Sequence, residues 1–266
     1  MNDSPIGIFD SGVGGLTVLK EIAELLPAEN ILYLGETARV PYGIRSTETV
    51  IRYSFECTEF LLRQNIKLLV VACNTVSAIS LHKIREAVSI PVIGVIDPGA
   101  AAAVNATKNK RIGIIGTEAT IKSSSYVKAI KALDKDIEVS GLPCPLFVPL
   151  VEEGWTEGTI ARLIAEKYLK DITDREVDTL VLGCTHYPLL KGVIQGVMND
   201  VSLVDSAIET AKAVKYILDG QGSRDILEDS GQGKLKFYVT DSPDKFISVG
   251  ERFLQRKIED IEKIEL

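Results

Sequence analysis

Two cysteines stand where a thiol could carry out acid and base chemistry. Cys73 follows the apolar run Leu68–Ala72, and Cys184 follows the apolar run Leu180–Gly183; small polar residues and a helical pattern come after each. A helix N-terminus favours the thiolate and lowers the pKa of a cysteine from about 8.5. Two thiols on opposite sides of one carbon could remove a proton from one face and return one to the other. The pair therefore predicts a reaction that inverts a stereocentre.

Two further ionisable residues are placed to assist the thiols. Asp10 follows the apolar run Ile6–Phe9 and could orient or deprotonate Cys73. His186 comes shortly after Cys184 and could serve that thiol, which is the usual logic of an activated cysteine. The alternative for His186 is a hydrogen bond to a nearby loop without a chemical role. Other residues of these types are expected to be structural or, for the histidine, solvated: Cys57, Cys144 and His82.

Hydroxyl and amide side chains near these residues could bind the carboxylates of an amino acid. They are Ser11, Asn74, Thr75, Thr117, Thr120 and Thr185. The segment Ser11–Gly15 looks like a nucleotide loop, but Thr17 replaces the last glycine of that motif and no GxxxxGK[ST] occurs. We expect its glycines to form a tight turn whose amides approach a carboxylate. A rigid turn could contribute further amides to the same ligand: Pro41, Tyr42 and Gly43.

These side chains need a scaffold that brings separate strand ends together. Short runs rich in Val, Ile and Leu alternate with amphipathic stretches, which is typical of a parallel sheet covered on both faces. The predicted strands are Ile6–Phe9, Ile31–Leu34, Leu68–Ala72, Val92–Val95, Arg111–Ile115, Leu180–Gly183 and Leu235–Val239. The predicted helices are Leu16–Leu25, Thr47–Gln64, Val76–Val88, Ser123–Ala132, Thr159–Asp171, Ala207–Leu218 and Pro243–Ile258. Ligands bind outside the carboxyl ends of such strands, which is where both cysteines lie.

The sequence also carries a faint internal duplication. Ile6–Gly12 resembles Ile112–Glu118, and Leu69–Thr75 resembles Leu180–His186. We therefore expect two similar open parallel-sheet α/β domains, related by a pseudo-two-fold axis, with the active site in the cleft between them. The first domain is expected to comprise residues 1–97 and 209–266, and the second residues 98–208.

The composition is that of an ordinary globular protein with a mild excess of acid. The chain has 266 residues, of which 45% are hydrophobic and 25% charged, and its formal net charge is -7. An acidic surface repels phosphate backbones, so no nucleic-acid partner is expected. The sequence shows neither a secretion signal nor an apolar run of roughly 20 residues, so we expect no membrane partner and a cytoplasmic location. The four cysteines form no CxxC pair, and no metal-site motif is indicated.

Longer motifs around the candidate residues resemble one known family. They are Phe9–Gly15, Val40–Gly43, Ala72–Thr75, Cys144–Gly154 and Leu182–Leu190. Together they resemble glutamate racemases of the aspartate/glutamate racemase family, in order and through nearly the whole chain. The resemblance implies two α/β domains with the site between them, a homodimer, and L- and D-glutamate as substrates without metal or cofactor. It also implies the supply of D-glutamate for peptidoglycan.

The same resemblance implies roles for individual residues. Cys73 would take the proton from D-glutamate, and Cys184 would take it from L-glutamate. Asp10, Glu152 and His186 match positions that assist the thiols or polarise the substrate. The family usually has Gly-Asp-Thr before an arginine, where this chain has Gly35–Arg39 with Glu36 at the acidic position. We therefore do not count Glu36 as catalytic.

Other functions fit parts of the same pattern. An aspartate racemase would share both thiols, and its substrate would differ by one methylene, worth only about 1–3 kcal/mol in an apolar pocket; the motifs favour glutamate. Cys73, Cys184 and His186 could instead ligate zinc, because thiolate and imidazole are its usual ligands. A non-catalytic amino-acid-binding protein is the remaining alternative.

Overall fold

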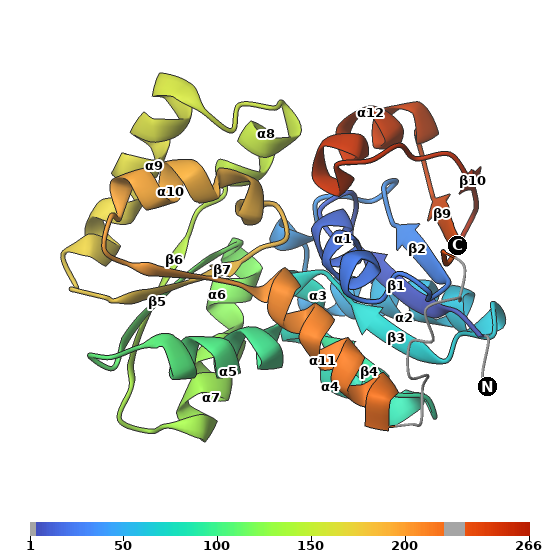
Figure 1. Ribbon diagram of the computed structural model, residues 1–266, viewed down its shortest axis with the longest axis horizontal. Coiled ribbons are helices and arrows are strands. Elements are labelled where there is room, and N and C mark those ends of the chain that lie inside the picture. The colour runs from blue at the N-terminus through green and yellow to red at the C-terminus, as the bar shows by residue number, and fades with distance from the viewer. Residues whose placement is uncertain (1–3, 221–231) are drawn as a thin grey trace.

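Two parallel sheets form the framework of the molecule (Figure 1). The computed structural model describes residues 4–220 and 232–266. The larger sheet has the strand order β10-β9-β2-β1-β3-β4. Its strands are β1 (Ile6–Asp10), β2 (Ile31–Gly35), β3 (Leu68–Val71), β4 (Val92–Gly94), β9 (Leu235–Val239) and β10 (Ile261–Lys263). The start of the chain, where no secretion signal is expected, includes residues 1–3, which lie outside the described residues.

The smaller sheet has the same strand order as the four strands β2-β1-β3-β4 of the larger sheet. Its order is β6-β5-β7-β8, and its strands are β5 (Arg111–Gly116), β6 (Glu138–Pro143), β7 (Thr179–Gly183) and β8 (Ser202–Asp205). β5 pairs in parallel with β6 and β7, as β1 does with β2 and β3. The internal duplication thus corresponds to a repeated four-strand order. The predicted fold class, two parallel-sheet α/β domains, is confirmed.

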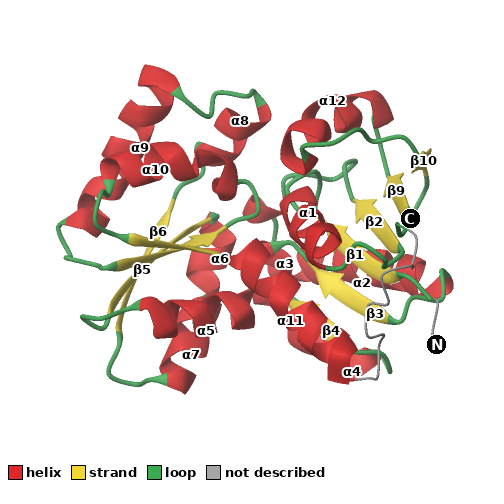
Figure 2. Ribbon diagram, viewed as in Figure 1, coloured by secondary structure: helices red, strands yellow, loops and turns green. Residues whose placement is uncertain are grey.

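Helices pack around both sheets (Figure 2). They are α1 (Leu16–Leu25), α2 (Thr47–Arg63), α3 (Asn74–Ile79), α4 (Leu81–Ala87), α5 (Ile96–Ala106), α6 (Glu118–Ser123), α7 (Ser125–Leu133), α8 (Phe147–Glu152), α9 (Gly158–Thr173), α10 (Lys191–Val197), α11 (Ser206–Gly220) and α12 (Pro243–Leu254), with the 3-10 turns η1 (Tyr42–Ile44) and η2 (Tyr187–Leu190). All five residues of β1 are buried. Ile8 packs in one hydrophobic cluster and Phe9 in another, because successive side chains point to opposite faces. No helix in the described ranges is long and apolar enough to span a membrane.

The chain passes between the sheets twice. α5 connects β4 to β5, and the chain returns from β8 through α11 toward β9. The two helices pack against each other, and α11 also packs against α1. The expected domain limits at residues 97/98 and 208/209 fall within α5 and α11, and this division stays a prediction; residues 221–231 of the expected first domain lie outside the described ranges.

Some predicted helices differ from those observed. The single helix predicted over Val76–Val88 is wrong: the structure has α3 and α4, which meet at Ser80. Ser80 caps α3 through its backbone N–H, and the helical hydrogen bonds begin again from it. The helix predicted to run to Ile258 ends at Leu254, because Gln255 has a left-handed backbone with φ of 56° that stops the helix. The earlier start of α3 at Asn74 makes Cys73 its N-cap residue.

Candidate active site

One cavity lies between the two sheets, where the carboxyl ends of their strands converge. Its volume is about 70 Å³, and both Cys73 and Cys184 line it. The other predicted site residues that line it are Ser11, Pro41, Tyr42, Gly43, Asn74, Thr75, Thr117, Glu152, Thr185 and His186. Asp10 and Thr120 are buried outside this lining. Two thiols from separate halves of the chain thus line one small cavity.

A chain of polar contacts leads from Cys184 to the edge of the cavity. Cys184 Sγ lies 3.9 Å from His186 Nδ1, and His186 Nε2 lies 3.1 Å from Glu152 Oε1. Burial opposes the charge on His186, but hydrogen bonds with Cys184 and Glu152 outweigh it and raise the pKa of the imidazole to about 10. The hydrogen bond with His186 lowers the pKa of Glu152. At neutral pH Cys184 therefore faces an imidazolium, which is backed by a carboxylate.

The surroundings of Cys73 carry the opposite charge. Its Sγ lies 3.4 Å from Ser11 Oγ. Burial, together with the negative charge of Asp10, raises the pKa of Cys73 to about 12. Asp10 itself accepts a hydrogen bond from Gly12 N–H at 2.9 Å through Oδ2, while Oδ1 has no partner. The structure therefore brings Ser11 into contact with this thiol and gives Asp10 an electrostatic influence on it.

Three threonine hydroxyls from the two sheets meet at one end of the cavity. Thr75 Oγ1 and Thr117 Oγ1 are 3.0 Å apart, and Thr120 Oγ1 lies 3.0 Å from Thr117 Oγ1. Thr75 belongs to α3, and the other two belong to the start of α6. Thr120 thus supports the lining hydroxyls from behind. Each hydroxyl can both donate and accept, so the group can rearrange to donate to a carboxylate.

The amide of Asn74 is held so that its donor is free. Tyr126 OH, from α7, donates to Asn74 Oδ1 at 2.7 Å. Asn74 Nδ2 is buried without a partner. An unsatisfied buried donor costs about 1–3 kcal/mol, which a ligand oxygen could recover. Sequence reasoning did not identify Tyr126, because it reads as one more apolar position of an amphipathic helix.

Hydrogen bonds to the buried carboxylate of Glu36 hold the segment with Pro41, Tyr42 and Gly43 in place. Glu36 is fully buried and accepts hydrogen bonds from Arg39 Nε at 2.9 Å, Tyr42 OH at 2.9 Å and Thr240 Oγ1 at 3.0 Å. Arg39 also pairs with Glu56 and stacks on the ring of Tyr53. Glu36 does not line the cavity. Its carboxylate instead anchors the loop that does.

Gly14 is needed because the opposite loop packs directly on it. A Cβ at this position would lie 2.2 Å from Thr185 Oγ1 and 2.5 Å from His186 Nδ1. Thr17 Oγ1 also crosses this gap and donates to Thr185 O at 3.0 Å. Gly12 N–H donates to the carboxylate of Asp10 within the protein, and the approach of this turn's amides to a ligand carboxylate stays a prediction. The role of Gly14 in the contact between sheets was not visible in the sequence, where glycine indicates a turn as readily as a close approach.

Four more residues line the cavity that the sequence analysis did not name individually. They are Gly12, Val13, Val40 and Val148. Each lies inside or beside a quoted motif, and that position is the signal that could have found them. Val13, Val40 and Val148 add apolar surface to the wall, and a less polar surrounding strengthens electrostatic contacts.

The other candidates lie away from this cavity. Cys57 and Cys144 are fully buried, and burial raises the pKa of both thiols. His82 is exposed on α4. Within residues 4–220 and 232–266, no group of three or more His, Cys, Asp or Glu side chains is arranged to hold a metal ion.

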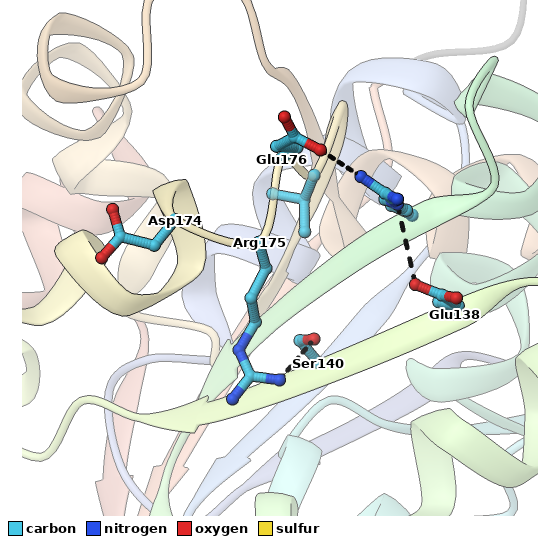
Figure 3. A pocket seen from close by; sticks show the side chains of 7 residues that line it. Glu138, Ser140, Asp174, Arg175 and Glu176 are labelled. Atoms are coloured by element: carbon cyan, nitrogen blue, oxygen red, sulfur yellow. Dashed lines mark hydrogen bonds and ion pairs between the residues drawn. The ribbon is translucent and has the colours of Figure 1, made fainter.

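A larger hollow of about 270 Å³ lies at the opposite ends of the small sheet's strands (Figure 3). Arg111, at the start of β5, pairs there with Glu176 and with Glu138 at 3.6 Å. Arg175 donates to Ser140 Oγ at 3.4 Å. Its charged side chains are exposed and compensate one another, and no thiol or buried ionisable group lines it. We therefore assign the chemistry to the cavity with the two cysteines.

Comparison with known proteins shows the family to which the chain belongs. Residues 6–214 match the family described as Asp/Glu/Hydantoin racemase. The chain belongs to this racemase family. It is 55% identical to the glutamate racemase of Geobacter metallireducens over 262 residues, which cover 98% of this chain and 96% of that relative. The predicted family and the predicted enzyme class, isomerase, are thereby confirmed.

Solved structures of glutamate racemases superpose on nearly the whole chain. Glutamate racemase from Francisella tularensis in complex with D-glutamate matches with a TM-score of 0.93 and 39% identity, covering 100% of this chain and 98% of that one. Glutamate racemase from Thermus thermophilus in complex with β-chloro-D-alanine matches with a TM-score of 0.90 and 43% identity, covering 99% and 98%. An aspartate racemase from Picrophilus torridus shares the fold at 20% identity and a TM-score of 0.58, covering 83% and 95%.

Proposed function

We propose that this racemase interconverts L- and D-glutamate, with Cys73 and Cys184 as its two acid and base groups. The observation that carries the proposal is that two thiols, attached to different sheets, line one cavity. A proton can then leave one face of the substrate α-carbon while another arrives at the opposite face. The small volume of the site limits the water that can reach the carbanion formed between the two transfers.

The charges around the thiols favour one starting arrangement. The raised pKa of Cys73, about 12, keeps it protonated at neutral pH. Cys184 Sγ lies 3.9 Å from Nδ1 of the His186 imidazolium, so we take Cys184 as the base that starts the reaction from L-glutamate. In this arrangement Cys184 takes the α-proton of L-glutamate, and the Cys73 thiol delivers its own proton to the other face. The thiolate is then on Cys73 and the product is D-glutamate; the reverse reaction starts from that state.

The remaining lining groups are proposed to bind the carboxylates of the substrate. Asn74 Nδ2 is a buried donor without a protein partner, and the hydroxyls of Thr75 and Thr117 can turn toward a ligand. Donors directed at the α-carboxylate stabilise the negative charge that spreads onto it as the α-proton leaves. Ser11, Thr185 and the turn with Tyr42 complete the wall.

We propose glutamate rather than aspartate as the substrate because the more similar relatives are glutamate racemases. The glutamate racemases named above are 39% to 55% identical and cover nearly the whole chain. The aspartate racemase of Picrophilus torridus is only 20% identical. We further propose that the D-glutamate is used for peptidoglycan, and that the enzyme acts as a cytoplasmic homodimer without metal or cofactor.

The direct test is racemisation by purified, metal-free protein, followed by circular dichroism of L- and D-glutamate. Replacing Cys73 or Cys184 by Ser should lower turnover by at least about 1000-fold, because a hydroxyl is a far weaker acid than a thiol. Cys57→Ser and Cys144→Ser serve as controls that keep most of the activity. Near-normal turnover by either active-site variant would refute the two-thiol mechanism, and zinc bound stoichiometrically to an inactive protein would favour the zinc-site alternative.

The face served by each thiol can be tested with 3-chloroglutamate. Loss of the α-proton and of chloride from the β-carbon gives an enamine, which hydrolyses to 2-oxoglutarate and ammonia, so only one thiol is needed. Cys73→Ser should eliminate from the L-analogue through Cys184, and Cys184→Ser from the D-analogue through Cys73. Swapped preferences would leave the two-thiol mechanism intact and reverse the assignment of faces.

A further inference from the structure

The helix α12 reaches from the large sheet to the residues that support Cys184. Arg252, near its end, donates a hydrogen bond to the backbone carbonyl of Glu152. The next residue, Phe253, is buried and packs against the ring of His186, with centroids 5.2 Å apart and planes at 85°. α8, which ends at Glu152, faces α12 across the space between the sheets (Figure 1). Two consecutive residues therefore contact both members of the Glu152–His186 pair.

The backbone after α8 is shaped to receive Arg252. Gly154 has a φ of +80°, and a Cβ there would lie 2.2 Å from Arg252 Nη1. The guanidinium thus occupies the space that a side chain at residue 154 would fill. The contact lies at the surface, and Arg252 and Gly154 are both exposed.

The support of the two thiols is therefore unequal. Cys73 contacts Ser11, which is carried by the same sheet. Cys184 depends on His186 and Glu152, and these in turn are held by α12 from the opposite sheet. α12 contacts the Glu152–His186 pair directly, whereas it reaches the loop with Ser11 indirectly, through α1 and through Tyr33, whose OH donates to Gly12 O.

We propose that Arg252 and Phe253 are positioning residues that hold Glu152 and His186 in place, and so govern proton transfer at Cys184 more directly than at Cys73. The inference rests on the proposed glutamate racemisation. The contact between α12 and α8 would then link the distance between the two sheets to the position of the groups that assist Cys184.

Racemisation rates alone cannot reveal such a one-sided effect. L- and D-glutamate have equal free energies, so kcat/KM must be the same in both directions for every variant. Isotope effects do distinguish the two transfers. With α-deuterated L-glutamate the deuteron is removed by Cys184, and with α-deuterated D-glutamate it is removed by Cys73. Slowing one transfer makes it more rate-limiting and raises the isotope effect seen from its own side.

The test compares Arg252→Met with the wild-type protein. We expect kcat/KM to fall about 10- to 100-fold in both directions, the cost of a misplaced catalytic group. The isotope effect should rise for α-deuterated L-glutamate and fall toward unity for the D-enantiomer. Arg252→Lys can still donate to the Glu152 carbonyl, so it should restore part of kcat/KM and bring the isotope effects back toward those of the wild type.

The matched control is Lys245→Met. Lys245 is exposed on α12 and, like Arg252, its charge lowers the pKa of Glu152, although no hydrogen bond joins them in the described structure. Its isotope effects should match those of the wild type; the Arg252→Met pattern in this control would overturn the proposal. Lower activity of Arg252→Met with unchanged isotope effects would also overturn it, because a smaller folded fraction gives that result. A wild-type protein that does not racemise glutamate would refute the proposed function itself.

Discussion

At the scale of single residues, the two thiols that line the cavity differ in the charge of their surroundings rather than in exposure. Cys73 is 5% exposed and Cys184 is 6% exposed, so a reagent reaches both with similar difficulty. Asp10 lies near the first and the His186 imidazolium near the second. Chemical reactivity should therefore report the electrostatic surroundings directly.

This difference predicts the order of alkylation in the substrate-free protein. With iodoacetamide at neutral pH we expect Cys184 to be modified first, and Cys57 and Cys144 to stay unmodified in the folded state. The pKa of Cys73, about 12, means that its thiolate is scarce at neutral pH; its labelling rate should rise about tenfold for each pH unit below that value. Peptide mass spectrometry over a pH series gives the rates. Faster labelling of Cys73 than of Cys184 at neutral pH would contradict the assigned charges.

At the scale of elements, the loop between β2 and α2 depends on one buried carboxylate. Glu36→Asp, which installs the residue usual in the family, shortens the side chain by one methylene. It should then lose at least one of its contacts with Arg39, Tyr42 and Thr240. We expect the free energy of unfolding to fall by about 1–3 kcal/mol, and KM to rise because Tyr42 lines the cavity. Urea unfolding and steady-state kinetics measure both effects.

The control for that substitution is Glu59→Asp. Glu59 is exposed on α2, so the same loss of a methylene occurs in solvent. Stability and KM should both stay close to the wild type. An unchanged KM in Glu36→Asp together with a loss of stability would show that the carboxylate supports the fold without shaping the site.

The strands that were predicted from sequence are those with apolar runs. β1, β3 and β7 are fully buried, and their sequences are dominated by Ile, Leu, Val and Phe. β6, β8 and β10 were not predicted, and each lies at an edge of its sheet. Exposed or partly exposed residues such as Glu138 and Ser202 interrupt their pattern. Edge strands are stabilised by a neighbour that the local sequence does not reveal.

The same limit applies to the site. Residues that follow a strand, such as Cys73, Thr117 and Cys184, could be found because strand ends meet in a parallel sheet. Tyr126 and Arg252 could not, because each acts on the site from a helix of the other sheet. Which helix surface meets which loop is decided by how the sheets pack, and no local pattern carries that information.

At the scale of the whole molecule, the approach of the two sheets leaves no space at Gly14. Gly14→Ala would drive a methyl group into Thr185 and His186. We expect a loss of about 1–3 kcal/mol in stability from overpacking, and a fall in kcat of about 100-fold as His186 moves. Thermal unfolding and turnover measure the two effects.

The matched control for this change is Gly196→Ala. Gly196 lies in α10, and a Cβ there meets nothing within 4 Å. Alanine is the better helix former, so this variant should be about 0.5–1 kcal/mol more stable with normal turnover. Equal activity in both variants would mean that the sheets can separate at Gly14 without cost to the chemistry.

The order of strands in the large sheet also governs how the protein emerges during synthesis. β2 pairs with β9, which the ribosome delivers only after the whole small sheet has been made. Until then β2 is an open edge whose Ile31 and Tyr33 are destined for the core. Unpaired apolar edges attract strands of other chains. The nascent protein therefore carries an aggregation-prone edge through the translation of about two hundred residues, and the last strands to appear close it.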